Sequence, residues 1–308
     1  MRRLVLSVIA ITMLVSISGC GDETTPSGRL DKVWGRRGIS EGRFQTPRAI
    51  AIDKDDLLYI VDKLGRIQVF TPDGEFLRGW TTPAIENGKP CGMTFDDAGN
   101  LVVADTHYFQ VLFYKPDGTW LQEKTIGGVN GQGEGEFHFL TDVVQDSKGN
   151  YYVGEYGEHD RIQKFSRDGK FLLQWGGHGR EPGKFVRPQG ITIDKQDRIW
   201  VADACNHRIQ IFNDTGKLLS VWGEHGKEVG QLSYPYGIEL DGKGHAYICE
   251  FGNNRVQKFT TDGESLGYWG TSGRREGELH QPWGLAIDSE GLVHVLDTYN
   301  HRVQRIRL

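Results

Sequence analysis

Short stretches in which apolar and polar residues alternate recur along the chain, and each stretch ends at an acidic residue. Residues 49–53 are one example, and the acids that end the six copies are Asp53, Asp96, Asp146, Asp194, Asp241 and Asp288. Successive acids lie 43, 50, 48, 47 and 47 residues apart. Alternation with a period of two is typical of a half-buried strand, and a near-constant period of this length indicates a repeat architecture.

Each copy also contains signals for three further strands. Nine residues after the first acid stands a second one: Asp62, Asp105, Glu155, Asp203, Glu250 and Asp297. A third segment begins with arginine in five copies and with Gln110 in the second copy. A glycine-containing hairpin turn follows, and then a fourth segment that ends at tryptophan in four of the copies. Four short strands in each of six repeats predict an all-β fold, a six-bladed β-propeller with four antiparallel strands per blade.

The sixth copy lacks a fourth strand, because no further segment follows residues 303–308. At the other end, residues 28–34 align with residues 74–80, glycine on glycine and tryptophan on tryptophan. We therefore expect the N-terminal strand to complete the last blade and to close the ring, which removes an open sheet joint. One propeller domain should cover residues 28–308.

Residues that recur in every copy are interpreted as structural. The first acids should accept hydrogen bonds in turns, and the second acids should pair with backbone amides or with the neighbouring arginine. The tryptophans that end the fourth strands should pack between blades. A ligand site, in contrast, must break the sixfold symmetry.

The N-terminus has the features of a secretory signal. Arg2 and Arg3 precede an apolar segment, residues 4–17, that is too short to span a membrane comfortably. Residues 17–20 resemble a bacterial lipobox. This resemblance implies a lipoprotein signal peptide over residues 1–19, lipid on Cys20, and a short tether over residues 20–27. The alternative is an ordinary signal peptide with a chance cysteine.

Composition and charge narrow the range of partners that we expect the protein to bind. The 308 residues include 36 Lys and Arg against 41 Asp and Glu, a formal net charge of −5. Such a chain has no basic field to hold a phosphate backbone, so nucleic acid is not an expected partner. The 42 glycines suit a fold with many tight turns. We expect an exported monomer that touches the membrane only through its lipid, on the periplasmic or extracellular side.

Two of the copies carry a more specific pattern. Residues 188–194 read Pro-Gln-Gly-Ile-Thr-Ile-Asp, residues 201–203 read Val-Ala-Asp, and residues 206–212 read Asn-His-Arg-Ile-Gln-Ile-Phe; residues 282–304 repeat this pattern. It resembles the NHL-repeat family of six-bladed propellers, and the resemblance covers nearly all of residues 28–308. It implies the fold but no single function, since propellers host many unrelated activities.

The position five residues before the first acid of each copy breaks the symmetry. It should lie at one mouth of the central channel, and all six residues differ: Arg48, Cys91, Thr141, Gln189, Tyr236 and Trp283. An arginine offers a forked donor for a carboxylate or phosphate, and aromatic rings offer flat surfaces for a sugar or a peptide side chain. His107, Cys205 and Tyr299, each two residues after a second acid, could extend this surface. The alternative is that the mouth varies only because it is exposed to solvent.

Metal and cysteine chemistry find little support in the sequence. The peptidyl-hydroxyglycine amidating lyases have a similar propeller, and that resemblance implies zinc-binding histidines in these slots. None of the six slots holds a histidine, and Cys91 alone does not supply the three protein ligands that catalytic zinc requires. We therefore assign no catalytic residue and no cofactor, although a divalent cation in the channel stays open. The sequence also leaves open whether Cys205 and Cys249 form a disulfide or stay free thiols.

Two function classes follow. The favoured one is a non-catalytic binding or scaffold module at the cell envelope, whose channel mouth takes a protein, peptide or glycan ligand. The alternative is an enzyme of the propeller lyase or lactonase type. It would use a divalent metal in the channel and carboxylates such as Glu155 or Glu250, which replace aspartate in their series.

Overall fold

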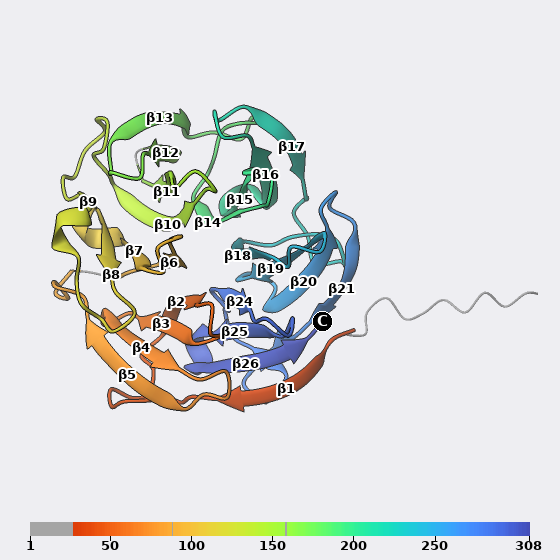
Figure 1. Ribbon diagram of the computed structural model, residues 1–308. Coiled ribbons are helices and arrows are strands. Elements are labelled where there is room, and N and C mark those ends of the chain that lie inside the picture. The colour runs from red at the N-terminus through yellow and green to blue at the C-terminus, as the bar shows by residue number, and fades with distance from the viewer. Residues whose placement is uncertain (1–26, 88, 158) are drawn as a thin grey trace, which may run out of the picture.

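The computed structural model describes residues 27–87, 89–157 and 159–308. The expected signal peptide, Cys20 and all but the last residue of the expected tether lie outside these ranges. Six four-stranded antiparallel sheets surround a central axis (Figure 1). The prediction of an all-β propeller with six blades of four strands is confirmed.

Blades 1 to 3 follow each other along the chain, and the first strand of each lies nearest the axis (Figure 1). Blade 1 consists of β2 (Pro47–Ile52), β3 (Leu58–Asp62), β4 (Arg66–Phe70) and β5 (Phe76–Thr81). Blade 2 consists of β6 (Gly92–Phe95), β7 (Leu101–Asp105), β8 (Gln110–Tyr114) and β9 (Ile126–Gly127), with the short helical turns η1 (Thr106–Tyr108) and η2 (Gln122–Lys124). Blade 3 consists of β10 (Phe139–Gln145), β11 (Tyr151–Tyr156), β12 (Arg161–Phe165) and β13 (Phe171–Gly176).

Blades 4 to 6 repeat the same order until the last strand. Blade 4 consists of β14 (Pro188–Ile193), β15 (Ile199–Asp203), β16 (Arg208–Phe212) and β17 (Leu218–Trp222), with η3 (Ala204–Asn206). Blade 5 consists of β18 (Pro235–Leu240), β19 (His245–Glu250), β20 (Arg255–Thr260) and β21 (Ser265–Trp269), and the two-residue strands β22 (Thr271–Ser272) and β23 (Glu278–Leu279) follow it. Blade 6 consists of β24 (Leu285–Ile287), β25 (Val293–Asp297), β26 (Arg302–Arg307) and β1 (Arg29–Trp34), with η4 (Thr298–Asn300).

The ring closes through β1, as the alignment of residues 28–34 predicts. β1 is the outer strand of blade 6 and pairs antiparallel with β26, so that Arg29 lies opposite Arg307 and Trp34 opposite Val303 (Figure 1). The backbone N–H of Ser27 donates a hydrogen bond to the carbonyl of Tyr268 at 2.9 Å, which ties the incoming chain to blade 5. Both ends of the described chain thus belong to blade 6, beside blade 5.

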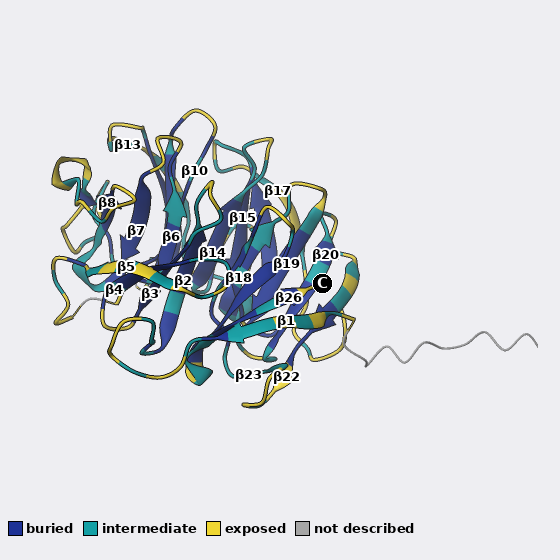
Figure 2. Cartoon of the chain, turned by 60° about the horizontal axis from the view of Figure 1, so that its bottom comes forward, coloured by how far each residue is buried: buried dark blue, intermediate teal, exposed yellow. Residues whose placement is uncertain are grey.

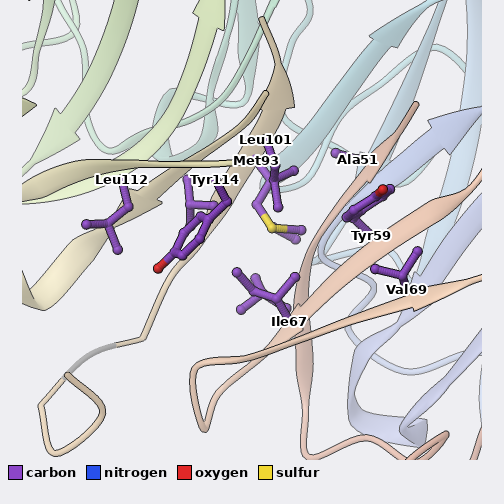
Figure 3. Close-up of a cluster of buried hydrophobic side chains, with 11 residues drawn as sticks. Ala51, Tyr59, Ile67, Val69, Met93, Leu101, Leu112 and Tyr114 are labelled. Atoms are coloured by element: carbon purple, nitrogen blue, oxygen red, sulfur yellow. The ribbon is translucent and has the colours of Figure 1, made fainter. Parts of the chain in front are cut away.

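The hydrophobic core is divided into clusters between neighbouring blades. Between blades 1 and 2, Tyr59 and Ile67 meet Met93, Leu112 and Tyr114 (Figure 3). Each blade has a neighbour on both faces, so every residue of the second strands β3, β7 and β15 is buried. The outer strand β5, in contrast, alternates between half-buried and exposed positions (Figure 2). Burial on both faces explains why the second strands contain runs of apolar residues.

The tryptophans that end the outer strands pack against the hairpin turn of the next blade, as expected. A Cβ atom on Gly216 would lie 2.8 Å from the ring of Trp175, and one on Gly74 would lie 2.4 Å from the ring of Trp34. Both glycines also have positive φ angles, +79° and +84°. Glycine is needed here for two reasons, the left-handed backbone and the close approach of the indole.

A hydrogen-bonded group that we call the staple joins the second acid of five blades to the loop that precedes the blade. In blade 5, the buried carboxylate of Glu250 accepts hydrogen bonds from Arg255 Nε at 2.6 Å and from Gln257 Nε2 at 2.7 Å. The remaining N–H groups of Arg255 donate to the carbonyls of Lys227, Glu228 and Gln231 in the preceding loop, each at 2.8 Å. The expected pairing of second acid with arginine is confirmed in the five blades with acids Asp62, Glu155, Asp203, Glu250 and Asp297.

Blade 2 lacks the staple. Gln110 and Leu112 stand where the other blades have arginine and glutamine, and Leu112 belongs to the apolar cluster beside Tyr114. Asp105 is fully buried, and neither of its carboxyl oxygens accepts a hydrogen bond from the described residues. Burial raises the pKa of Asp105 to about 7, with Gln110 acting weakly in the opposite direction. The amide donor in the other blades comes 17 residues earlier, which in blade 2 is residue 88, outside the described ranges.

Candidate functional site at the channel mouth

The first strand of each blade begins on the face where the second strand ends, because Pro188 pairs with Asp203 and Pro235 with Glu250. On this face the channel opens into a narrow cavity of about 40 Å³. Five of the six residues predicted to break the symmetry line this cavity: Arg48, Cys91, Gln189, Tyr236 and Trp283. These five residues therefore lie together at one mouth of the channel, and their role in binding stays a prediction.

One wall of the mouth is aromatic. The rings of Tyr236 and Phe251 are stacked with centroids 4.5 Å apart, and Trp283 meets Tyr236 edge-on at 5.0 Å. Burial raises the pKa of Tyr236, and the nearby Arg187 acts in the opposite direction. Since the tyrosine hydroxyl keeps its proton at neutral pH, this wall offers flat apolar surface together with a hydrogen-bond donor.

Two half-buried arginines stand over this wall. The guanidinium carbon of Arg48 lies 4.9 Å from the Trp283 ring, and that of Arg187 lies 4.8 Å from Tyr156 and 5.6 Å from Tyr236. Nη1 of Arg48 contacts the Cys91 sulfur at 3.6 Å, and Nε of Arg187 donates to Oε1 of Gln189 at 3.3 Å.

Neither of these arginines forms an ion pair with a carboxylate of the described residues. The Nε atom of Arg48 and the indole nitrogen of Trp283 are both buried without an acceptor there. The arginines of the staple, in contrast, each bind an acid. The mouth therefore carries two positive charges that the described part of the chain does not neutralise.

Two carboxyl groups line the same cavity among the first strands. Asp142 accepts hydrogen bonds from the backbone N–H groups of Ile191 and Val143, both at 2.9 Å. Glu239 accepts one from the Thr192 hydroxyl at 3.4 Å. Burial raises the pKa of Asp142 to about 7 and that of Glu239 to about 8, and the charge of Asp142 adds to the shift of Glu239. Each carboxyl accordingly exchanges its proton near neutral pH.

The remaining predicted residues lie around the mouth or away from it. Thr141 is buried, and its hydroxyl lies against Gly154 of β11 rather than in the channel. The His107 ring packs 5.3 Å from Phe139, and burial, with smaller effects of Lys89 and Arg48, lowers its pKa. Tyr299 is 43% exposed and packs on His280 at the rim.

The three described cysteines, Cys91, Cys205 and Cys249, are free thiols, so the disulfide considered between Cys205 and Cys249 does not form. Burial raises the pKa of both Cys205 and Cys249. Cys205 is half-buried, whereas Cys249 is buried in the cluster between blades 5 and 6, as a small apolar filler would be.

The glutamates proposed for an enzyme are not in the channel. Glu155 and Glu250 are fully buried, and each is bound by an arginine, a glutamine and a backbone amide of the staple. Their carboxylates support the loops between blades. Within residues 27–87, 89–157 and 159–308, no three histidine, cysteine or acidic side chains come together to hold a metal ion.

Sequence reasoning missed several mouth residues, although the same symmetry test could have found them. Arg187 lies two residues before the slot, where the six blades again all differ: Thr46, Lys89, Phe139, Arg187, Tyr234 and Gln281. Asp142 lies one residue after the slot, where four other blades have glycine. Tyr156 and Phe251 follow the second acid by one residue, next to the register of His107 and Tyr299.

Comparison with known proteins identifies the repeat. Residues 185–212 and 279–306 match the family model of the NHL repeat. The chain is a six-bladed β-propeller that contains NHL repeats. It is 31% identical to NHL repeat-containing protein 3 of Mus musculus over 199 residues. The alignment covers 59% of this chain and 55% of that protein. This propeller therefore spans about half the length of that relative.

A second group of relatives contains enzymes. The propeller is 29% identical to peptidylglycine alpha-amidating monooxygenase of Rattus norvegicus over 186 residues. The alignment covers 58% of this chain but 18% of that enzyme. Two solved structures share its fold at 14% identity. Virginiamycin B lyase from Staphylococcus aureus has a TM-score of 0.60, covering 85% of this chain and 80% of the lyase. A gluconolactonase from Xanthomonas campestris has a TM-score of 0.64, covering 87% of each chain.

Among the described residues of this NHL propeller, no helix is long and apolar enough to cross a membrane.

Proposed function

We propose that this NHL propeller is a binding module whose ligand, a peptide or another molecule with a carboxylate, seats in the channel mouth. The observation that carries the proposal is the pair Arg48 and Arg187. Both are half-buried, both lie over aromatic rings, and neither has a carboxylate partner among the described residues. A guanidinium in such a place pairs well with a carboxylate, which it can bind through two parallel hydrogen bonds.

The aromatic wall supports an apolar group next to that carboxylate. Tyr236 and Trp283 line the cavity, and Phe251 packs against both rings, a common arrangement in sites that bind small molecules or peptide side chains. A peptide ending in a free carboxylate combines both features. A glycan without an acidic group would use the aromatic wall but leave the arginines unpaired.

The test uses a pool of N-acyl amino acids, each with an apolar acyl chain and a free carboxylate, observed by ligand-detected NMR. We expect members of the pool to bind, and their carboxamide counterparts to bind about 10- to 100-fold more weakly, since a charged hydrogen-bonded pair is lost. The double variant Arg48→Gln/Arg187→Gln should lose affinity by a similar factor. Arg29→Gln, at an exposed position on the opposite face, is the matched control and should bind as the natural chain does.

Binding that is equal for acids and amides, or that survives the double variant, would overturn the proposal. So would the lack of any binding up to about 10 mM, which corresponds to less than about 3 kcal/mol of binding free energy. Chemical conversion of a pool member during the measurement would instead favour the enzymatic alternative, for which Asp142 and Glu239 are the carboxyls in the channel with pKa values near neutrality.

The proposal includes an anchor at the cell envelope through lipid on Cys20. In support, the described chain begins at the face opposite the mouth, because Arg29 pairs with Arg307 at the end of β26. A short tether would thus leave the mouth pointing away from the membrane. Cell fractionation tests the anchor: the natural chain should sediment with membranes and the Cys20→Ala variant should not, and equal sedimentation of both would overturn it.

A further inference from the structure

We propose that the mouth takes a zwitterion, a short peptide with both ends free, whose carboxylate meets Arg48 and Arg187 and whose ammonium group meets Asp142 and Glu239. This inference rests on the proposed function, since it assigns the second half of the same ligand. It starts from one cavity that Arg48, Asp142 and Glu239 line without ion pairs between them among the described residues. Arg187 lies over the ring of Tyr236, which lines the same cavity.

Asp142 is a departure from the repeat. At its position four blades have glycine and blade 1 has Ala49, because the first strands converge there around the axis. A Cβ atom on Gly92 would lie 2.3 Å from Oδ1 of Asp142, so the carboxyl occupies space that the glycine of the neighbouring blade leaves free. The two residues fit each other, and the carboxyl is a built part of the channel wall.

Asp142 and Glu239 have hydrogen-bond donors but lack a positive partner in the described part of the chain. Backbone amides serve Asp142, and a distant threonine hydroxyl serves Glu239. Burial raises the pKa of both groups, as given above, because a carboxylate without a cation is poorly stabilised there. A cation bound between them would supply the missing partner.

An ammonium group suits this place better than a metal ion. It offers three N–H donors, which two carboxylates and one further acceptor can satisfy. A divalent ion such as calcium takes six to eight oxygen ligands, and the described residues gather no group of three metal-binding side chains. Glu239 also lines the cavity that continues toward the other face, so this carboxyl lies deeper in the channel than Arg48.

The order of charges selects a polar direction for the ligand. Carboxylate recognition lies at the rim, the aromatic residues Tyr236 and Trp283 form the wall, and ammonium recognition lies inside. A dianion such as a phosphate ester would meet like charge at the carboxyls, which opposes deep insertion. A peptide with a free amino group instead places complementary charges at both ends.

The experiment compares matched ligand pairs on the whole chain. Each N-acyl amino acid from the test above is paired with the dipeptide that differs only by a free amino group on the acyl chain, and both are titrated by calorimetry near pH 7. We expect the dipeptide to bind about tenfold or more tightly than its desamino counterpart. Asp142→Asn should remove this advantage and leave the affinity for the desamino ligand within about twofold.

Glu239→Gln provides a second variant and should reduce the same advantage. The desamino ligand reports in each variant whether the mouth is still folded and competent. If desamino ligands bind as tightly as dipeptides in the natural chain, or if the advantage survives in both variants, the zwitterion proposal is overturned and the binding function stands. If neither ligand binds, both proposals are overturned.

Discussion

Blade 5 and blade 2 bury an acidic side chain at the same position but surround it differently. Glu250 accepts hydrogen bonds from an arginine, a glutamine, an asparagine and a backbone amide, whereas Asp105 accepts none from the described residues. In blade 5 the acid is the centre of a network that holds the preceding loop to the blade. In blade 2 the carboxyl occupies the same position, but no described residue takes the place of the arginine and glutamine of the staple. Burial raises the pKa of both carboxyls, but Arg255 opposes the shift of Glu250, whereas the pKa of Asp105 rises to about 7.

Removing the arginine of the staple should have the larger effect. Arg255→Ala leaves Glu250 buried without its cation and removes the donors of three loop carbonyls, so we expect the free energy of unfolding to fall by roughly 5 kcal/mol. In blade 2, Gln110→Ala removes no ion pair and should cost less than about 1 kcal/mol. Urea unfolding followed by tryptophan fluorescence measures both. Equal losses in the two blades would show that the staple contributes little.

The pH dependence of stability distinguishes the blades in a second way. The folded protein keeps the Asp105 proton up to about pH 7, while an unfolded chain releases it near 3.8. The contribution of Asp105 to the free energy of unfolding should therefore fall as pH rises from about 4 to about 7, and then level off. Asp105→Asn removes this contribution. The free energy of unfolding of the variant, minus that of the natural chain, should therefore increase by up to about 4 kcal/mol from pH 4 to pH 8.

Gln110→Arg sharpens that measurement. An arginine at this position would supply the cation that Asp105 lacks, and it should flatten the same pH dependence by lowering the pKa of the carboxyl. Gln110→Met has similar length without charge and is the matched control. Unchanged pH profiles for both Asp105→Asn and Gln110→Arg would mean that Asp105 does not titrate near neutrality in the folded protein.

The fold could be predicted because its requirements repeat. The repeats share a strand buried on both faces, a glycine turn under the outer-strand residue of the preceding blade, and a second acid. The same residue types therefore recur every 43 to 50 positions. Closure could be predicted for the same reason, since residues 28–34 contain the tryptophan and glycine of an outer strand. The sequence did not reveal that blade 2 lacks the staple, because Gln110 and Leu112 look like ordinary substitutions at the positions of its arginine and glutamine.

The site was predicted in part. The slot of Arg48 and Trp283 lies at a fixed distance from a repeated acid, so its place on the ring follows from the repeat itself. The direction of the side chain does not follow from the repeat. Thr141 occupies the same slot, but its hydroxyl lies against Gly154. Asp142 was missed for a related reason: its carboxyl meets the channel only because Gly92, 50 residues earlier in the chain, leaves room for it. Such contacts between blades do not show in local spacing.

The pairing of β1 with β26 also sets an order of folding. The ion pair between Asp31 and Arg305 joins positions 274 residues apart, so β1 is synthesised long before its partner. Blades 1 to 5 each contain four consecutive strands and can form in turn, while β1 waits without a neighbouring strand. Until β26 emerges, the edge of β1 is open to other chains. Blade 6 is therefore the step at which a newly made chain is most exposed to mispairing.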